Sequence, residues 1–427
     1  MPFPDSLARR PGRALALALV AGCVGLAHAE PLTFTRALDL ATSETPALRA
    51  DAAQLDAARD AVLPAGQLPD PKLALGLDNL PINGPDHYRV GDDFMTMRRV
   101  GLMQEFPNRA KREARVAVAQ GEVAVAVAQT AVTRQQVQQE TALAWIARHT
   151  VERQLARIDA LRAENRLFDA GVRARLAGGG GLAADGVAPR QEAAAIDNLQ
   201  DRFEARREQA IAQLERWIGE PAREPLAGAV PDWPIARDGL LHRLHAHPDV
   251  ALLGARETVA QAAIAQAQAA KKSDWALALA YQQRGPQFSD MATLEVTFDL
   301  PLFAAHRQDP TIAARRAERD ALQAQREATL REHTAMLDTD LAEYRRLDKA
   351  LARQKQVLLP LAAEKIALAS VAWRAGQGSL ADLVAARRER IEAELEAITL
   401  EGKRQQMAAR LHYRDGNGDT LISGDLP

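Results

Sequence analysis

The chain has 427 residues, of which 47% are hydrophobic but only 4% aromatic, so its apolar content is mostly Ala and Leu. Such a composition favours helices packed on helices over ordinary globular domains. The 54 basic and 56 acidic residues nearly cancel, so net charge gives no reason to bind nucleic acid or an anionic surface. The single cysteine excludes an internal disulfide framework, and the absence of a run of about 20 apolar residues after residue 30 argues against a membrane-spanning helix.

Residues 1–29 have the pattern of a secretory signal peptide. A basic segment ending at Arg13 precedes an apolar run over 14–27, and the small-x-small sequence 27–29 is the favoured cleavage site. The alternative is a lipobox-like sequence that would leave Cys23 as a lipid-modified N-terminus. Both routes predict export across the inner membrane.

Proline-free stretches predict very long helices. No proline occurs between residues 108 and 188, or between 311 and 359. We expect helices over 108–170 and 311–375, the second kinked at Pro360. At 1.5 Å per residue each would reach about 95 Å, far beyond a globular domain, and would need another surface to bury its apolar stripe. Shorter helices are expected over 33–62 and 182–219.

The second half of the sequence repeats the first. An offset of 202 residues places Leu73, Leu75 and Leu77 on Trp275, Leu277 and Leu279, and an offset of 197 places Asp185 on Asp382. Each half therefore reads as helix, strand, strand, long helix, shorter helix. The predicted organisation is a first repeat over 30–230, a second over 231–413, and a flexible tail over 414–427.

Four short segments alternate with a period of two. Leu73, Leu75 and Leu77 show this pattern, and so do Leu294, Val296 and Phe298, which alternate with Thr and Glu residues. Strands of this kind have one apolar and one polar face, and about ten residues suffice for a tilted strand to cross a membrane. From periodicity alone, hairpins in a soluble α+β domain are equally consistent. In a membrane, four strands cannot close a barrel, so three copies would have to supply twelve.

The turn before the last helix carries the most specific motif. It runs from Trp373 through Gly376, Ser379 and Asp382 to Leu383, and the corresponding turn of the first half keeps Gly179 and Asp185. Two further signatures, QEFPNRAKREA from residue 104 and LPLFAAHRQ from residue 300, each precede a long helix. With these motifs the chain resembles, over residues 32–413, the TolC family of outer-membrane efflux channels. More narrowly, it resembles the heavy-metal branch that serves resistance-nodulation-division (RND) pumps.

The resemblance implies a mainly α fold with a small β part: a homotrimer with a twelve-stranded barrel in outer-membrane lipid and a helical tube in the periplasm. The implied partners are a periplasmic membrane-fusion adaptor and, through it, an inner-membrane RND pump. The implied function is a passive duct, with no enzymatic activity and no cofactor, for heavy-metal cations. A channel for drugs or for type I secretion keeps the same architecture. A soluble periplasmic coiled-coil adaptor or scaffold is the alternative of a different class.

The resemblance also assigns roles to the tip residues. Gly376, Ser379, Leu383, Gly179 and Asp185 are the expected adaptor-docking residues. Asp382 matches an acidic ring at the periplasmic end of the pore, and Trp373 stands at a gate position. The alternative role for Asp382 is to cap the helix that follows it.

Two polar clusters are not interpreted as metal sites. His242, His245 and His247 have a spacing that suits no single helix face, and no carboxylate or cysteine completes a set, so we expect a solvated helix start. The tail over 415–419 begins like a calcium loop but lacks its sixth-position glycine and twelfth-position acid.

Overall fold

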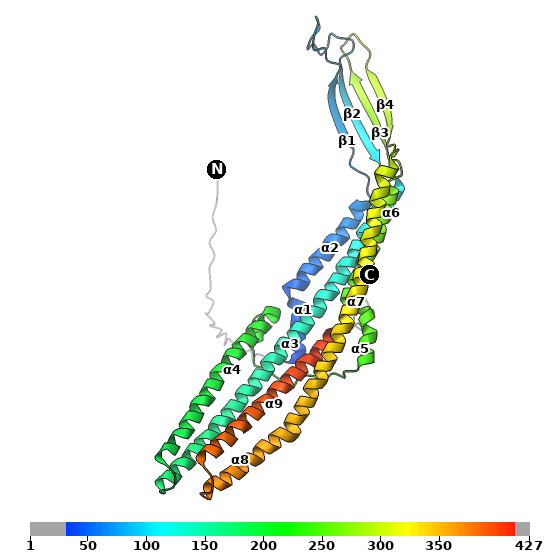
Figure 1. The fold of residues 1–427 in the computed structure, drawn as a ribbon. Helices are drawn as coiled ribbons and strands as arrows, with labels where there is room; N and C mark the ends of the chain where they lie inside the picture. The colour runs from blue at the N-terminus through cyan, green and yellow to red at the C-terminus, as the bar shows by residue number, and fades with distance from the viewer. Residues whose placement is uncertain (1–30, 415–427) are drawn as a thin grey trace, which may run out of the picture.

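The computed structural model describes residues 31–414, and the chain is elongated, with a sheet at one end and two helical tips at the other (Figure 1). The helices are α1 (Phe34–Glu44), α2 (Pro46–Gly66), α3 (Arg109–Ala177), α4 (Ala188–Ile218), α5 (Arg237–Arg243), α6 (Pro248–Ala269), α7 (Gln308–Arg353), α8 (Leu359–Arg374) and α9 (Leu380–Arg414). The strands are β1 (Lys72–Asp78), β2 (Met97–Phe106), β3 (Trp275–Gln283) and β4 (Met291–Phe298). The mainly helical fold with a small β part is confirmed. The expected signal peptide, with Cys23, and the calcium-like sequence of the tail lie outside the described residues.

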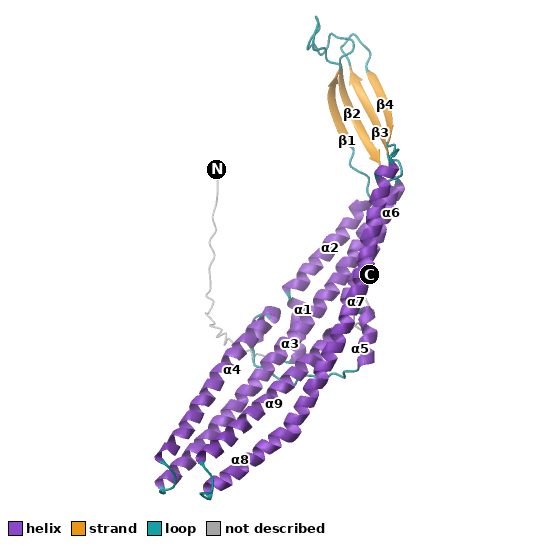
Figure 2. Cartoon of the chain, in the orientation of Figure 1, coloured by secondary structure: helices purple, strands orange, loops and turns teal. Residues whose placement is uncertain are grey.

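Long α3 is the axis of the helical part (Figure 2). Its 69 residues correspond to about 104 Å, and the Asn108 side chain caps its start by accepting a hydrogen bond from the Ala110 amide. Helices α2, α4, α6 and α9 pack along it. The second long helix continues from α7 into α8 through a π-helical turn over Gln354–Leu358, directly before Pro360. The expected irregularity at Pro360 is therefore present as this π turn.

The helix expected over 33–62 is instead broken at Thr45. Pro46 is the first residue of α2, and a residue before proline is disfavoured in the helical conformation, so Thr45 adopts an extended backbone. Its hydroxyl donates to the Ala41 carbonyl and, at 3.1 Å, to the Trp217 carbonyl. The break thus occurs where the side chain can satisfy the carbonyls of two helices.

The largest core cluster joins α1, α3, α4 and α9 around Trp145, which is fully buried. The Trp145 indole N–H donates to the Leu32 carbonyl at 3.2 Å, and its ring meets Phe34 edge-on at 5.4 Å between centroids. Nearby, a Cβ at Gly402 would lie 2.3 Å from the Thr150 hydroxyl, so α9 approaches α3 this closely only because residue 402 is glycine.

The four strands form one antiparallel sheet in the order β1-β2-β3-β4. Residues that pair across antiparallel strands share a face, and the register places most of the alternating apolar side chains on one face, together with Arg98, while Met97 and Met103 of β2 lie on the other. That apolar face carries Leu73, Leu75 and Leu77 of β1, Val100 and Leu102 of β2, Leu279 and Tyr281 of β3, and Leu294, Val296 and Phe298 of β4. The opposite face contains a row of small residues, Ala74, Gly101, Ala280 and Thr293.

Two of the long helices contain windows that, by length and composition alone, could cross a membrane: α3 and the continuous helix Gln308–Arg374. Both helices are 67 residues or longer, far more than a single crossing needs, and almost none of either window is buried within the chain.

Candidate functional site

The two helical tips lie side by side at the end of the chain opposite the sheet (Figure 1). The α3–α4 turn uses Gly179 and Gly181, with φ of +77° and +104°, and the α8–α9 turn uses Gly376, with φ of +74°. Residues that have a side chain rarely adopt this left-handed backbone conformation, which explains why the sequence motif has glycine at these positions. Gly179, Gly376 and Ser379 are exposed, as a docking role requires.

At each tip an aspartate three residues after the N-cap of the second helical segment bonds to that N-cap residue, but through different groups. The Ser379 hydroxyl donates to Asp382 Oδ2 at 2.7 Å and accepts from the Asp382 amide at 3.1 Å. At the other tip the Leu182 amide donates to Asp185 Oδ2 at 2.9 Å. The capping role considered for Asp382 therefore belongs to Ser379, and Asp382 lies in the first turn of α9 with its carboxylate exposed.

A small apolar cluster fastens the two tips together. Phe168 and Val172 of α3 pack against Leu380 and Leu383 of α9, with Trp373 at the margin. Leu383 is only 4% exposed. In this conformation Leu383 therefore does not present its side chain to a docking partner, because the side chain is packed inside the tip.

Polar contacts between the tips were not foreseen from the sequence. The Arg175 guanidinium lies 4.9 Å from the centroid of the Trp373 ring and donates to the Trp373 carbonyl. Further from the turn, Arg387 forms a bidentate ion pair with Glu192 at 2.7–3.1 Å and covers the Phe168 ring. Partners almost 200 residues apart leave no local pattern; the 197-residue offset of the repeat also aligns Arg190 with Arg387, but it does not indicate Glu192 as the partner.

A charged network continues along the interface of α3 and α9. Glu164 accepts from Arg157 at 2.9 Å and from Arg390, and Arg157 also reaches Glu394. Desolvation acts to raise the pKa of Glu164, but the two guanidinium groups outweigh it and hold the pKa below its usual value. The network places fixed charges between two helices of one chain.

The apolar face of the sheet is the second functional surface. Leu75 and Leu294 are 72% and 69% exposed, and the other leucines of β1 are exposed as well. Such an extended apolar face is not left in water by a stable protein. The outward edges of β1 and β4 pair with no other strand among residues 31–414, so the sheet is open at both edges, and β4, whose residues are all exposed, is open on both faces as well.

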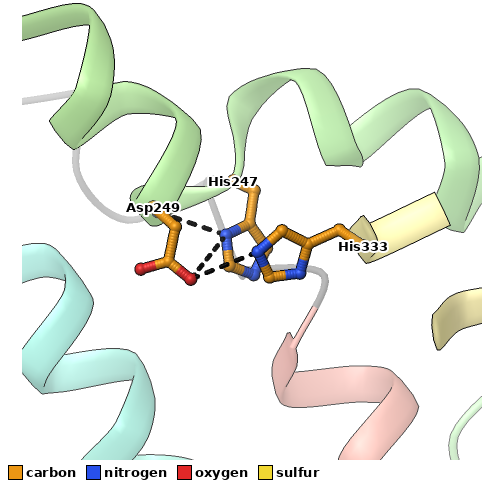
Figure 3. A group of neighbouring side chains, drawn as sticks. All are labelled: His247, Asp249 and His333. Carbon is orange, nitrogen blue, oxygen red and sulfur yellow. Dashed lines mark hydrogen bonds and ion pairs between the residues drawn. The ribbon is translucent and has the colours of Figure 1, made fainter. Parts of the chain in front are cut away.

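The histidine segment differs from expectation. His242 and His245 are exposed, as a solvated helix start requires, but His247 is buried and caps α6 by accepting from the Asp249 amide at 3.2 Å. Burial and the neighbouring ring of His333 lower the pKa of His247 to about 4. Two further residues lie beside His247: the carboxylate of Asp249, in the first turn of α6, and the imidazole of His333, in α7 (Figure 3). The expectation that no carboxylate accompanies these histidines was therefore wrong for His247.

Comparison with solved structures identifies the class of fold. The outer membrane protein VceC from Vibrio cholerae superposes with a TM-score of 0.72 at 18% identity, covering 90% of this chain and 96% of that one. The Neisseria gonorrhoeae MtrE outer membrane channel gives a TM-score of 0.74 at 17% identity, with coverages of 90% and 89%. CusC, whose structures are described in terms of conformational changes that accompany folding and transmembrane channel formation, superposes with a TM-score of 0.73 at 16% identity. The match covers 90% of this chain and 92% of that one.

No protein-family model matches the chain, and no curated protein matches it either. At this level of identity the likeness concerns the fold. The chain has the fold of outer-membrane channels, as the resemblance to the TolC family implied.

Proposed function

We propose that three copies of this chain form the outer-membrane channel of a tripartite efflux system. The free edges of β1 and β4 support this, since pairing β4 of one copy with β1 of the next would close a twelve-stranded barrel. The apolar face would then contact lipid and the face with the small row would line the lumen. The exposed apolar face is the observation that carries the proposal; a soluble coiled-coil adaptor would have to cover it.

One pair of substitutions tests the orientation of the sheet. Leu294→Arg places a charge on the apolar face, where it costs about 2–4 kcal/mol per copy at mid-membrane, and Thr293→Arg places the same charge on the opposite face of the same strand. We expect only Leu294→Arg to reduce the detergent-extractable trimer in the outer-membrane fraction of a sucrose gradient. Release of the wild-type protein by osmotic shock without detergent would contradict the proposal.

The tips are the proposed docking surface for a periplasmic membrane-fusion adaptor that links the channel to an RND pump. Gly179, Asp185, Gly376 and Ser379 are its candidate residues, while Leu383 supports the turn from within. A photo-crosslinking residue at Ser379 should capture the adaptor encoded with the pump, and one at the exposed Arg206, midway along α4, should not. Equal capture at both positions would remove the tips from the interface.

For cargo we propose heavy-metal cations, on the basis of the sequence resemblance. A strain lacking its own channel, supplied with this protein and its cognate adaptor and pump, should gain resistance to copper, zinc, cobalt or cadmium salts. Resistance to dyes and detergents alone would assign the channel to drug efflux. Export of a polypeptide would assign it to type I secretion.

A further inference from the structure

A compact cluster of metal-binding side chains lies far from both the tips and the sheet. His247 at the start of α6, Asp249 in its first turn and His333 of α7 place three ligand atoms within 4.8 Å of one another. Figure 3 shows both imidazole rings directing a nitrogen at the same carboxylate oxygen. His247 Nδ1 lies 3.7 Å and His333 Nε2 lies 3.3 Å from Asp249 Oδ2.

These separations are close to those in the coordination shell of a small divalent ion, and small side-chain adjustments would bring all three ligand atoms to one centre. Zinc binds histidine nitrogen and carboxylate oxygen at about 2.0–2.2 Å, so tetrahedral ligands lie about 3.3–3.5 Å apart. Two imidazoles and one carboxylate are a common donor set for zinc and its neighbours in the first transition row. A water molecule is expected to complete the four-coordinate shell.

The surroundings of His247 orient it as a ligand. The Asp249 amide donates to Nδ1 at 3.2 Å, so this nitrogen is unprotonated, and an ion bound between His247 and Asp249 would take its lone pair in place of the amide. The backbone of Arg414 also hydrogen-bonds the His247 ring, and outer contacts of this type fix the tautomer of metal-bound histidines. The nearby guanidinium of Arg414 forms an ion pair with Asp340, so its positive charge is already neutralised by another carboxylate.

The two rings are held together before any ion binds. Their centroids are 4.1 Å apart, His247 is 2% exposed, and His333 Nδ1 is buried without a hydrogen-bond partner. Gln135 of α3 contacts both His247 Nε2 and the last carbonyls of α9. The cluster therefore lies where α3, α6, α7 and the end of α9 converge.

We propose that His247, Asp249 and His333 form a resident binding site for a zinc-class divalent cation, which fastens the start of α6 to α7. The site lies between helices of one chain, so this role is independent of what the channel carries.

Tag-free trimer in detergent, stripped with a chelator, is titrated with Zn²⁺ by calorimetry and with Co²⁺ by visible absorption. We expect one ion per chain, a tetrahedral cobalt spectrum, and a zinc-dependent rise in melting temperature. His333→Ala and the near-isosteric Asp249→Asn should each weaken binding by at least about tenfold and abolish the melting shift. The double variant His242→Ala/His245→Ala removes two exposed histidines from the same segment and should bind as the wild type does.

Absence of Zn²⁺ binding and of a cobalt spectrum in the wild type would overturn the site, leaving a purely hydrogen-bonded cluster. Wild-type affinity in Asp249→Asn would do the same, as would loss of binding in the His242/His245 double variant. If His333→Ala does not elute as a trimer, Asp249→Asn and the wild-type cobalt spectrum decide the question.

Discussion

Arg175 and Trp373 join the two helical tips by two contacts at once: the guanidinium lies over the indole ring, 4.9 Å from its centroid, and donates to the carbonyl of the same residue. Arg175 is in the last turn of α3, and Trp373 is in the last turn of α8. Any outward movement of one hairpin relative to the other must break both contacts. We predict that this pair acts as a latch that holds the two tips together, at the position where the family resemblance implies a gate residue.

Removing the latch should open the tip. Cation–π and hydrogen-bond contacts are each worth about 1 kcal/mol, so Arg175→Ala should shift a closed-to-open equilibrium by about tenfold or more. The measurement is single-channel conductance or open probability in planar bilayers. The control is Arg173→Ala, which removes a neighbouring arginine that is 73% exposed and forms its ion pair with Asp169 of the same helix. If Arg175→Ala has the same conductance and open probability as Arg173→Ala and the wild type, the pair is not a latch.

The ion pair of Glu192 with Arg387 should contribute strongly to stability. Their side chains are only 9% and 12% exposed, and Arg387 also covers the Phe168 ring. Glu192→Ala leaves a largely buried guanidinium unpaired, a change that costs about 3–5 kcal/mol. Thermal unfolding of the detergent-solubilised protein should show a large drop in melting temperature. Glu392→Ala, which breaks the exposed pair with Arg388, should change stability by less than about 1 kcal/mol; equal effects would contradict the assignment.

Local patterns predicted the elements that depend on local chemistry. The alternation of Leu294, Val296 and Phe298 predicted a strand, because a period-two pattern can be recognised without knowing which strand pairs with it. Proline-free sequence predicted the long helices, and Gly376 predicted a turn that needs a left-handed residue. The strands have 7–10 residues rather than a uniform ten.

The remaining features depend on which helix faces meet in three dimensions. Arg175 and Trp373 meet only after two hairpins pack, and His247 and His333 meet only after α6 packs on α7. The burial of Leu383 follows from the rotation of α9 about its axis, which a motif does not specify. The break at Thr45 could be predicted in part from the sequence, because Pro46 restricts the backbone conformation of the residue before it.

Stability should depend on pH through Glu164. Because Arg157 and Arg390 outweigh desolvation and hold its pKa below the usual value, the folded protein binds this proton less readily than the unfolded chain. The stabilisation is therefore complete above the ordinary glutamate pKa of about 4.3 and is lost as pH falls through the lowered folded value.

Glu164→Gln should flatten this part of the profile, measured as melting temperature between about pH 6 and pH 3. Glu389→Gln tests a glutamate whose pair with Lys365 is exposed on both sides, and it should leave the slope almost unchanged. A wild-type slope in Glu164→Gln would assign the acid sensitivity to other carboxylates.

Asp382 tests whether the tip lies around a pore. In a trimer, three exposed carboxylates near the axis attract cations and raise cation selectivity. Asp382→Asn removes the charge, while the amide oxygen can still accept from the Ser379 hydroxyl, so the start of α9 should be preserved. We expect lower cation selectivity or altered conductance in bilayer recordings. Asp185→Asn neutralises the corresponding carboxylate of the other tip and shows whether the effect belongs to position 382. If both variants conduct as the wild type does, Asp382 is only part of the first turn of α9 and does not line the pore.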